Sequence, residues 1–126
     1  YCLDAFVKEM PFVNSGKIAV RFVPVGFLTP SSFGKAAFLL ESPNPQAALF
    51  SDMRGVSRDD SGGVPALSSP SPGIRAALQH NQELLEQTGS DLVPDLVFRL
   101  PDGHVGMIRG DFPPYALQAI SRGEMP

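Results

Sequence analysis

The chain has 126 residues, a formal net charge of -3, 43% hydrophobic side chains and one cysteine. This length is typical of one domain, and a single cysteine excludes an internal disulfide framework and a multi-cysteine zinc site supplied by this chain alone. The mild acidity and the scattered Lys and Arg residues argue against a nucleic-acid partner. No apolar run approaches the ~18 residues that cross a bilayer, which argues against membrane insertion.

The first residues carry a helical pattern. Apolar side chains recur at the spacing of one helix face, at Leu3, Phe6, Val7 and Met10. Residues 14–16 (Asn-Ser-Gly) predict the end of this helix. Because the pattern starts without a lead-in after Tyr1, we expect the chain to begin at a truncation, a cleavage point or the edge of a disordered boundary.

Residues 17–26 predict a β-strand, since apolar residues alternate along it and both of its faces are apolar. Pro24 has no N–H for a ladder of hydrogen bonds, so we expect the strand to end there or to lie at the edge of a sheet.

The segment from residue 29 to residue 89 predicts three helices. Pairs of residues that cap or break helices mark their ends, at Ser31-Ser32, Asn44-Pro45, Ser71-Pro72 and Thr88-Gly89. The second helix is expected to be short, because residues 57–73 are rich in Ser, Pro, Gly and Asp and predict a long loop.

The last third predicts a β-hairpin followed by a helix. Residues 95–100 and 104–109 are the two strands, and Pro101-Asp102-Gly103 between them has the composition of a tight turn. Asp111 is expected to cap the final helix, with Leu117 facing inward.

The order of helix, strand, several helices, hairpin and helix predicts an α/β protein with a thioredoxin-like fold. One such domain would span residues 1–126, with a helical insertion at about 30–89. A complete fold of this kind begins with a strand that leads into the first helix. That first strand is expected to be absent from this sequence.

Cys2 lies at the start of the first predicted helix and is the first candidate for chemistry. Unsatisfied N–H groups and the positive end of a helix stabilise a thiolate and lower its pKa. An isolated cysteine is more often a small buried apolar side chain, and this second interpretation is the more common one.

Val93-Pro94 lies directly before the first hairpin strand. In a thioredoxin fold the proline at this point follows a cis peptide bond and packs against the redox cysteines, and the residue before it binds an incoming peptide through its backbone. The alternative is a trans proline that marks the start of a strand. His80 and His104 have no second ligand at metal spacing and are expected at the surface, so no metal site is predicted.

Several segments occur in an order and at a spacing that are together fairly specific. They are Tyr1-Cys2, residues 11–17 (Pro-Phe-Val-Asn-Ser-Gly-Lys), residues 25–31 (Val-Gly-Phe-Leu-Thr-Pro-Ser), residues 81–84 (Asn-Gln-Glu-Leu), Gly89 and Val93-Pro94. In these segments the chain resembles the catalytic domain of bacterial periplasmic thiol:disulfide interchange proteins of the DsbG and DsbC type, and the DsbG type is the closer fit.

The active site of that family is Cys-x-x-Cys, commonly with Tyr before the second cysteine. The resemblance implies that Cys2 is the second, resolving thiol and that the nucleophilic cysteine stands three positions earlier, before this sequence begins. In the other register Ala5 would replace the second cysteine, and the distance to Ser15-Gly16-Lys17 would be wrong. The first half of the Cys-x-x-Cys motif is therefore expected to be absent, together with the first strand.

The resemblance implies a protein-disulfide isomerase or oxidoreductase in the periplasm, without a cofactor. Tyr1, Val93 and Pro94 would bind substrate beside Cys2, although the family usually has Thr at the position of Val93. The implied partners are substrate proteins with disulfides or oxidised cysteines, a membrane-bound thiol reductant, and a second copy held through an N-terminal domain that this sequence lacks. With Cys2 alone, this stretch by itself is expected to be inactive.

Two alternatives stay open. In the first alternative, the chain is a redox-inactive thioredoxin-fold module that binds unfolded or partner polypeptides, as a chaperone does. In the weaker alternative, Cys2 pairs with the same residue of a second chain.

Overall fold

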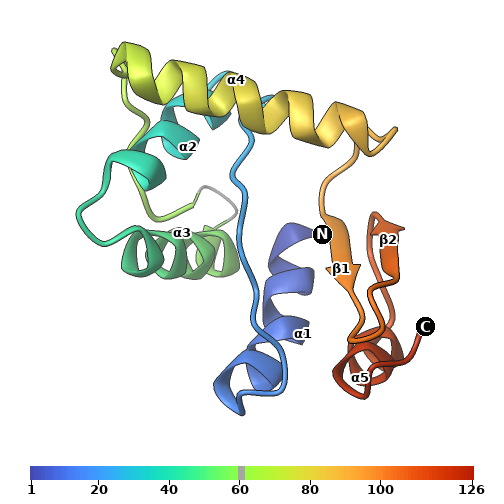
Figure 1. Cartoon of the computed structure of the whole chain (residues 1–126). Helices are drawn as coiled ribbons and strands as arrows, with labels where there is room; N and C mark the ends of the chain where they lie inside the picture. Colours follow the sequence, from blue (N-terminus) through green and yellow to red (C-terminus); the bar gives the residue numbers. More distant parts are fainter. Residues whose placement is uncertain (60–61) are drawn as a thin grey trace. The chain divides into compact units, whose positions relative to one another are not determined.

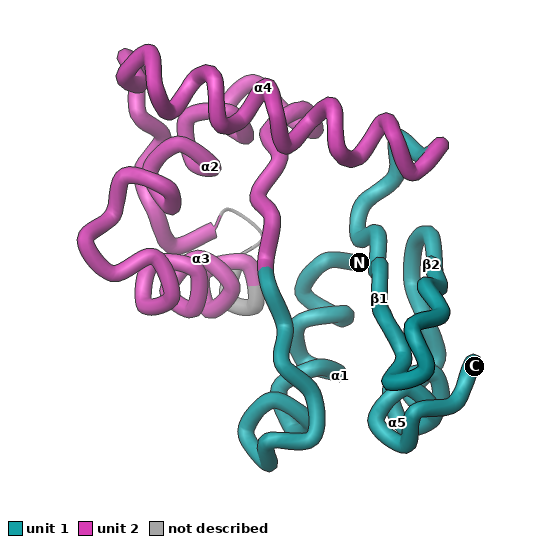
Figure 2. Tube along the Cα trace, viewed as in Figure 1, with its two compact units in different colours: residues 1–21, 90–126 teal, residues 22–89 magenta. Residues whose placement is uncertain are grey.

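The structure, a computed structural model, describes residues 1–59 and 62–126. The helices and strands in the described part of the chain are α1 (Cys2–Asn14), α2 (Ser32–Glu41), α3 (Pro45–Asp59), α4 (Pro72–Gln87), β1 (Asp95–Arg99), β2 (Val105–Arg109) and α5 (Pro114–Ser121) (Figure 1). The chain divides into two compact units (Figure 2). The first unit contains residues 1–21 and 90–126, and the second contains residues 22–89, within which the predicted helical insertion lies.

The first unit is built on the predicted hairpin. β1 and β2 pair in antiparallel register, with Leu96 opposite Ile108 and Phe98 opposite Gly106. The ring of Phe98 occupies the space that a Cβ at position 106 would need, so a larger residue there would displace this ring. The turn closes where the N–H of Gly103 donates to the carbonyl of Leu100 at 2.9 Å. Gly103 has a φ of 93°, which explains the glycine of the predicted turn.

The core of the first unit joins α1 to α5. Its buried members are Ala5, Phe112, Ala116 and Leu117, and around them pack Phe12, Ile18, Leu96 and Ile108. Because Leu96 and Ile108 are directly opposite each other, the same face of both strands is turned toward this core. The core therefore holds α1, the hairpin and α5 together.

The expected cap of α5 by Asp111 is wrong. The N-cap residue is Pro113, and no side chain caps this helix end. The carboxylate of Asp111 lies 2.6 Å from the ammonium group of Lys8 on α1, which also donates to the carbonyl of Phe112 at 2.9 Å. The helix begins at Pro114, with Pro113 as its N-cap, so Asp111 lies two residues before the capping position. The carboxylate of Asp111 pairs with Lys8 instead.

The second unit is a small helical bundle in which α2 contacts both α3 and α4. Buried alanines allow these helices to pack closely, with Ala36, Ala37 and Leu78 in one cluster and Leu39, Ala48 and Val64 in another. Two of the predicted helix starts are confirmed by side-chain caps. The hydroxyl of Ser71 accepts from the N–H of Ile74 at 3.3 Å, and the amide oxygen of Asn44 accepts from the N–H of Ala47 at 3.1 Å.

The strand expected at residues 17–26 is not formed. Within the described residues, β1 and β2 pair only with each other, and 17–26 is an irregular connection between the two units (Figure 1). The carbonyl of Pro24 accepts from the side-chain amide of Asn81 at 2.9 Å rather than from a neighbouring strand. An apolar pattern predicts a strand, but a strand forms only where a second strand offers a ladder.

The second helix is longer than expected, since α3 has 15 residues and runs to Asp59. Ser and Asp are only weakly unfavourable within a helix, and no proline interrupts this stretch. Residues 60–61 of the predicted loop lie outside the described residues. Among the described helices, none combines the length and the apolar character needed to cross a membrane.

Replacement of Leu117 by Ala is expected to lower the free energy of unfolding of the first unit by roughly 2–5 kcal/mol, because it leaves a cavity in the core. Leu117 is 2% exposed. Urea denaturation followed by circular dichroism measures the change. The matched control is Tyr115→Ala on the same helix, where the side chain is 66% exposed and a change of about 0.5 kcal/mol or less is expected. Equal costs for the two variants would contradict this core.

Replacement of Lys8 by Met is expected to raise the pKa of Asp111, because the hydrogen bond from Lys8 holds that pKa below its usual range. A depressed pKa in the folded state stabilises the fold above the ordinary pKa of aspartate, and this contribution is lost as the pH falls through the folded-state pKa. Carboxyl NMR titration of Asp111 measures the shift. Lys17→Met is the control and should leave the titration of Asp111 unchanged.

Candidate redox site

Cys2 is the first residue of α1, and the carbonyl of Tyr1 accepts the first hydrogen bond of the helix from Ala5 at 3.0 Å. The thiol is partly buried. Ala5 follows it by three residues on the same side of the helix and belongs to the core of the first unit. Cys2 therefore lies at the N-terminal end of the face of α1 that packs against the core of the first unit. Tyr1, in contrast, is exposed.

Burial raises the pKa of the Cys2 thiol above its ordinary value. The carboxylate of Glu9 adds to the rise. The cost of removing the thiolate from water thus outweighs its stabilisation by the helix end. This effect favours the interpretation of Cys2 as a buried side chain over that of a thiolate stabilised by the helix. Burial therefore favours the protonated thiol of Cys2 over the thiolate.

Glu9 is a residue that the sequence pattern did not single out. Its side chain is only 7% exposed, and burial raises the pKa of its carboxyl group. The hydrophobic face expected for α1 included Val7, yet Val7 is 60% exposed. The contact with α5 turns Ala5 and Phe12 inward instead, and Glu9 lies between them on that side. The signal in the sequence is the helical spacing of residues 2, 5, 9 and 12.

The Val93–Pro94 peptide bond is cis. Both residues are half-buried and directly precede β1. The carbonyl of Pro94 accepts from the N–H of Gly110 at 2.8 Å, which ties this segment to the residue that follows β2. Val93, Pro94, Tyr1 and Cys2 all belong to the first unit, so every residue expected at the site is carried by one compact part of the chain.

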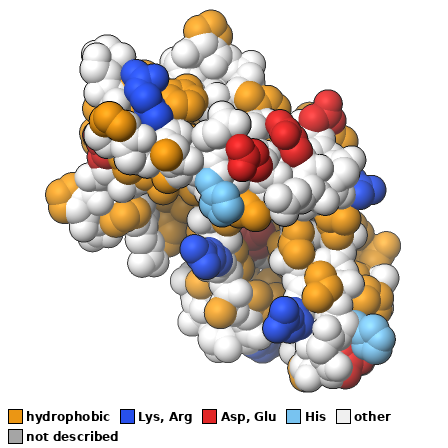
Figure 3. Space-filling model, turned by 45° about the horizontal axis from the view of Figure 1, so that its top comes forward, with side chains coloured by type: hydrophobic (Ala, Val, Ile, Leu, Met, Phe, Trp, Pro, Cys, Tyr) orange, Lys and Arg blue, Asp and Glu red, His pale blue; other side chains and the backbone are white. Residues whose placement is uncertain are grey.

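The two histidines are exposed, as expected. The backbone N–H of His104 donates to the carboxylate of Asp102 at 2.9 Å, and the His104 ring also lies 2.9 Å from that carboxylate. The backbone hydrogen bond first, and the one from the ring second, lower the pKa of Asp102. In the part of the chain that the structure describes, no group of three His, Cys, Asp or Glu residues could hold a metal ion. On the face drawn in Figure 3, Lys and Arg side chains lie apart from one another rather than in a patch.

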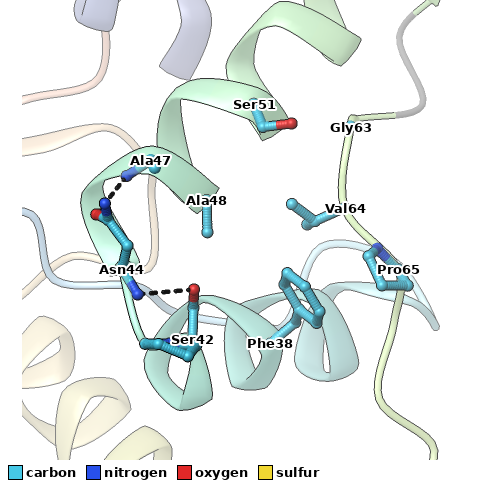
Figure 4. A pocket seen from close by; sticks show the side chains of 10 residues that line it. Phe38, Ser42, Asn44, Ala47, Ala48, Ser51, Gly63, Val64 and Pro65 are labelled. Carbon is cyan, nitrogen blue, oxygen red and sulfur yellow. Dashed lines mark hydrogen bonds between the residues drawn. The ribbon is translucent and has the colours of Figure 1, made fainter.

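The second unit contains a shallow hollow between α2, α3 and residues 63–65 (Figure 4). Two of its polar side chains bind the backbone, since the Ser42 hydroxyl accepts from the N–H of Asn44 at 3.2 Å and the side-chain amide oxygen of Asn44 caps α3. Phe38, Ala48 and Val64 make the rest of its lining apolar. The residues that line this hollow include two serines, Ser42 and Ser51, but no Cys, His, Asp, Glu, Lys or Arg that could activate a hydroxyl group.

The fold and the site together define a thioredoxin-like α/β protein with a partly buried thiol at the start of its first helix. Over 120 residues the chain is 28% identical to the thiol:disulfide interchange protein DsbG of Pseudomonas aeruginosa (strain PAO1), an alignment that covers 95% of this chain and 46% of that protein. Over 101 residues it is also 28% identical to the DsbG of Escherichia coli (strain K12), covering 78% of this chain and 38% of that protein.

The chain thus spans less than half the length of either relative. No protein-family model matches it. The two relatives confirm the resemblance to thiol:disulfide interchange proteins of the DsbG type, and for the first of them the similarity extends over nearly the whole chain.

The pH dependence of alkylation by iodoacetamide is expected to show a higher midpoint for Cys2 in the folded chain than in the same chain unfolded in urea. The physical reason is that burial disfavours the thiolate. Cys2 is the one thiol of this sequence, so the rate reports on it alone. A folded midpoint at or below the unfolded one would show that the helix end dominates.

Proposed function

We propose that this chain belongs to a periplasmic protein that exchanges disulfides in other proteins, and that Cys2 is the resolving thiol of its Cys-x-x-Cys pair. The observation that carries the proposal is a partly buried cysteine on the first turn of α1, in a chain similar to DsbG. A thiol that stays protonated until it is needed suits the second position of such a pair.

The first step belongs to a cysteine three positions before Cys2 in the full-length protein. Its thiolate attacks one sulfur of a substrate disulfide, and the other substrate sulfur leaves as a thiolate. This forms a mixed disulfide between enzyme and substrate. Cys2 then loses its proton, and its thiolate attacks the enzyme sulfur of that mixed disulfide. The bond to the substrate breaks, the substrate leaves reduced, and the enzyme holds an internal disulfide.

Tyr1, Val93 and Pro94 are the proposed substrate-binding residues. Val93 and Pro94 form the half-buried segment before β1, and an extended peptide would bind there through backbone hydrogen bonds. Isomerisation requires that the enzyme disulfide be reduced again, so a membrane-bound thiol reductant is the second proposed partner. The third proposed partner is a second copy of the protein, bound through a separate N-terminal domain. The alignments cover 46% and 38% of the two relatives, so more than half of each relative lies outside the matched part.

A second candidate is a redox-inactive module that binds unfolded polypeptides. The observation that favours it is the presence of one cysteine together with exposed apolar side chains at Phe27, Leu28 and Leu92. Such a module would bind peptides equally well after Cys2→Ser, since no sulfur chemistry is involved.

The test uses the full-length protein and a substrate with scrambled disulfides. Cys2→Ser is expected to lower the rate of isomerisation by roughly tenfold or more and to trap mixed disulfides, because the nucleophilic cysteine then has no thiol to release it. Mass spectrometry detects the trapped adducts. Ser15→Ala, at the end of the same helix, is the control and should retain the rate.

No turnover in the unsubstituted protein, with peptide binding that Cys2→Ser leaves unchanged, would establish the binding module instead. Dimers that disappear on reducing electrophoresis gels would show pairing of Cys2 between chains.

A further inference from the structure

One ammonium group on α1 makes three contacts with two consecutive residues that link β2 to α5. The Nζ of Lys8 donates to the carboxylate of Asp111 at 2.6 Å and to the carbonyl of Phe112 at 2.9 Å. The same atom lies 5.6 Å from the centre of the Phe112 ring, which is within the range of a cation–π contact. Lys8 and Asp111 are 103 positions apart in the sequence, so these contacts hold α1 against the segment that follows the hairpin.

The surroundings of Lys8 favour directional contacts. Its side chain is 24% exposed, and Phe112 beside it belongs to the core of the first unit. Hydrogen bonds between charged groups that are partly removed from water are stronger than those at an open surface. The core also joins α1 to this segment, but apolar contacts have no preferred direction. The hydrogen bonds of Lys8 therefore fix the register of α1 relative to residues 111–112.

The residues that Lys8 contacts directly follow the one backbone hydrogen bond of the Val93-Pro94 segment. The N–H of Gly110 donates to the carbonyl of Pro94 at 2.8 Å, and Pro94 has no N–H with which to return a bond. Across residues 1–59 and 62–126, no other backbone hydrogen bond is found for Val93 or Pro94. The position of Gly110 therefore determines how this segment is held before β1.

Gly110 is held from both sides by its neighbours in the chain. It has a φ of 77°, in the left-handed region that favours glycine, and a glycine backbone turns more freely than that of any other residue. On one side, Arg109 is paired with Asp95 in the hairpin. On the other side, Asp111 is bound by Lys8. Without Lys8, Gly110 keeps only the first of these two constraints.

We propose that Lys8 is a positioning residue, which fixes the Val93-Pro94 segment relative to α1 through residues 110–112. Its use in catalysis rests on the proposed function, in which a substrate peptide binds to the backbone of Val93-Pro94 and exchanges its disulfide at the start of α1. A peptide bound at this segment reaches the sulfur atoms only if the segment and α1 keep a constant distance. Because Lys8 lies on the same helix as Cys2, it supplies this constraint without contacting the substrate.

The first experiment measures amide hydrogen exchange by NMR in the unsubstituted chain and in Lys8→Met and Lys8→Arg. Met keeps an unbranched side chain but has no donor, so the Gly110 amide is expected to exchange about three- to tenfold faster. The Gly103 amide, which donates to Leu100 in the hairpin turn, is the internal control and should keep its rate. Arg retains the charge and the donors, and is expected to return the rate at Gly110 to within about twofold.

The second experiment measures the kinetics of the full-length protein with a disulfide-bonded peptide as substrate. Lys8→Met is expected to raise KM about three- to tenfold and to leave kcat within about twofold, because the binding segment shifts while the thiols are unchanged. Lys8→Arg should restore KM. Lys17→Met, which replaces an exposed lysine, is the matched control and should leave both constants unchanged. A merely structural role would instead reduce the folded fraction, which lowers kcat at an unchanged KM.

An unchanged exchange rate at Gly110 in folded Lys8→Met, or an equal acceleration at Gly110 and Gly103, would overturn the proposal. An unchanged KM in an active Lys8→Met protein would also overturn it. If Lys8→Met does not fold, Asp111→Ala decides by the same two measurements, since it removes the carboxylate from a side chain that is 46% exposed. Absence of turnover in the unsubstituted full-length protein would refute the proposed function, and the exchange rate of Gly110 would still test the role of Lys8.

Discussion

The packing of one face of α1 against α5 and the hairpin is the contact on which the first unit depends. Ala5 lies at its centre beside Phe112 and Leu117, and its small side chain lets the helices approach closely. Cys2 and Glu9 precede and follow Ala5 by about one turn each, so the same contact turns both toward the interior. A hydrophobic contact between two helices thus decides the environment of the thiol.

The electrostatic consequences follow from that burial. A thiol at a fully exposed helix start would tend toward the thiolate, whereas the partly buried Cys2 has a raised pKa. The same desolvation acts on Glu9. In an interchange reaction the nucleophilic cysteine must be ionised, whereas the resolving cysteine stays protonated until the mixed disulfide has formed. The two positions of a Cys-x-x-Cys pair therefore need opposite environments. α1 supplies the second of these environments.

Local features were predictable from the sequence, because they depend on neighbouring residues. The turn at Pro101-Asp102-Gly103 and the cap at Ser71 are examples. Features that depend on distant partners were not. Residues 17–26 have the pattern of a strand, but among the described residues β1 and β2 pair only with each other, and Asp111 pairs with Lys8 across the sequence instead of capping its own helix. The candidate site shows the same division, since Cys2 and Val93-Pro94 stand in recognisable segments, whereas the burial of Glu9 depends on which side of α1 meets α5.

The central claim, that Cys2 is the second half of a redox pair, is tested most directly by mapping the disulfides of the oxidised full-length protein by mass spectrometry after proteolysis under non-reducing conditions. The account predicts a peptide in which Cys2 is bonded to a cysteine three residues before it in the same chain. A free Cys2 in the oxidised protein, or Cys2 bonded only to a second copy, would contradict the account.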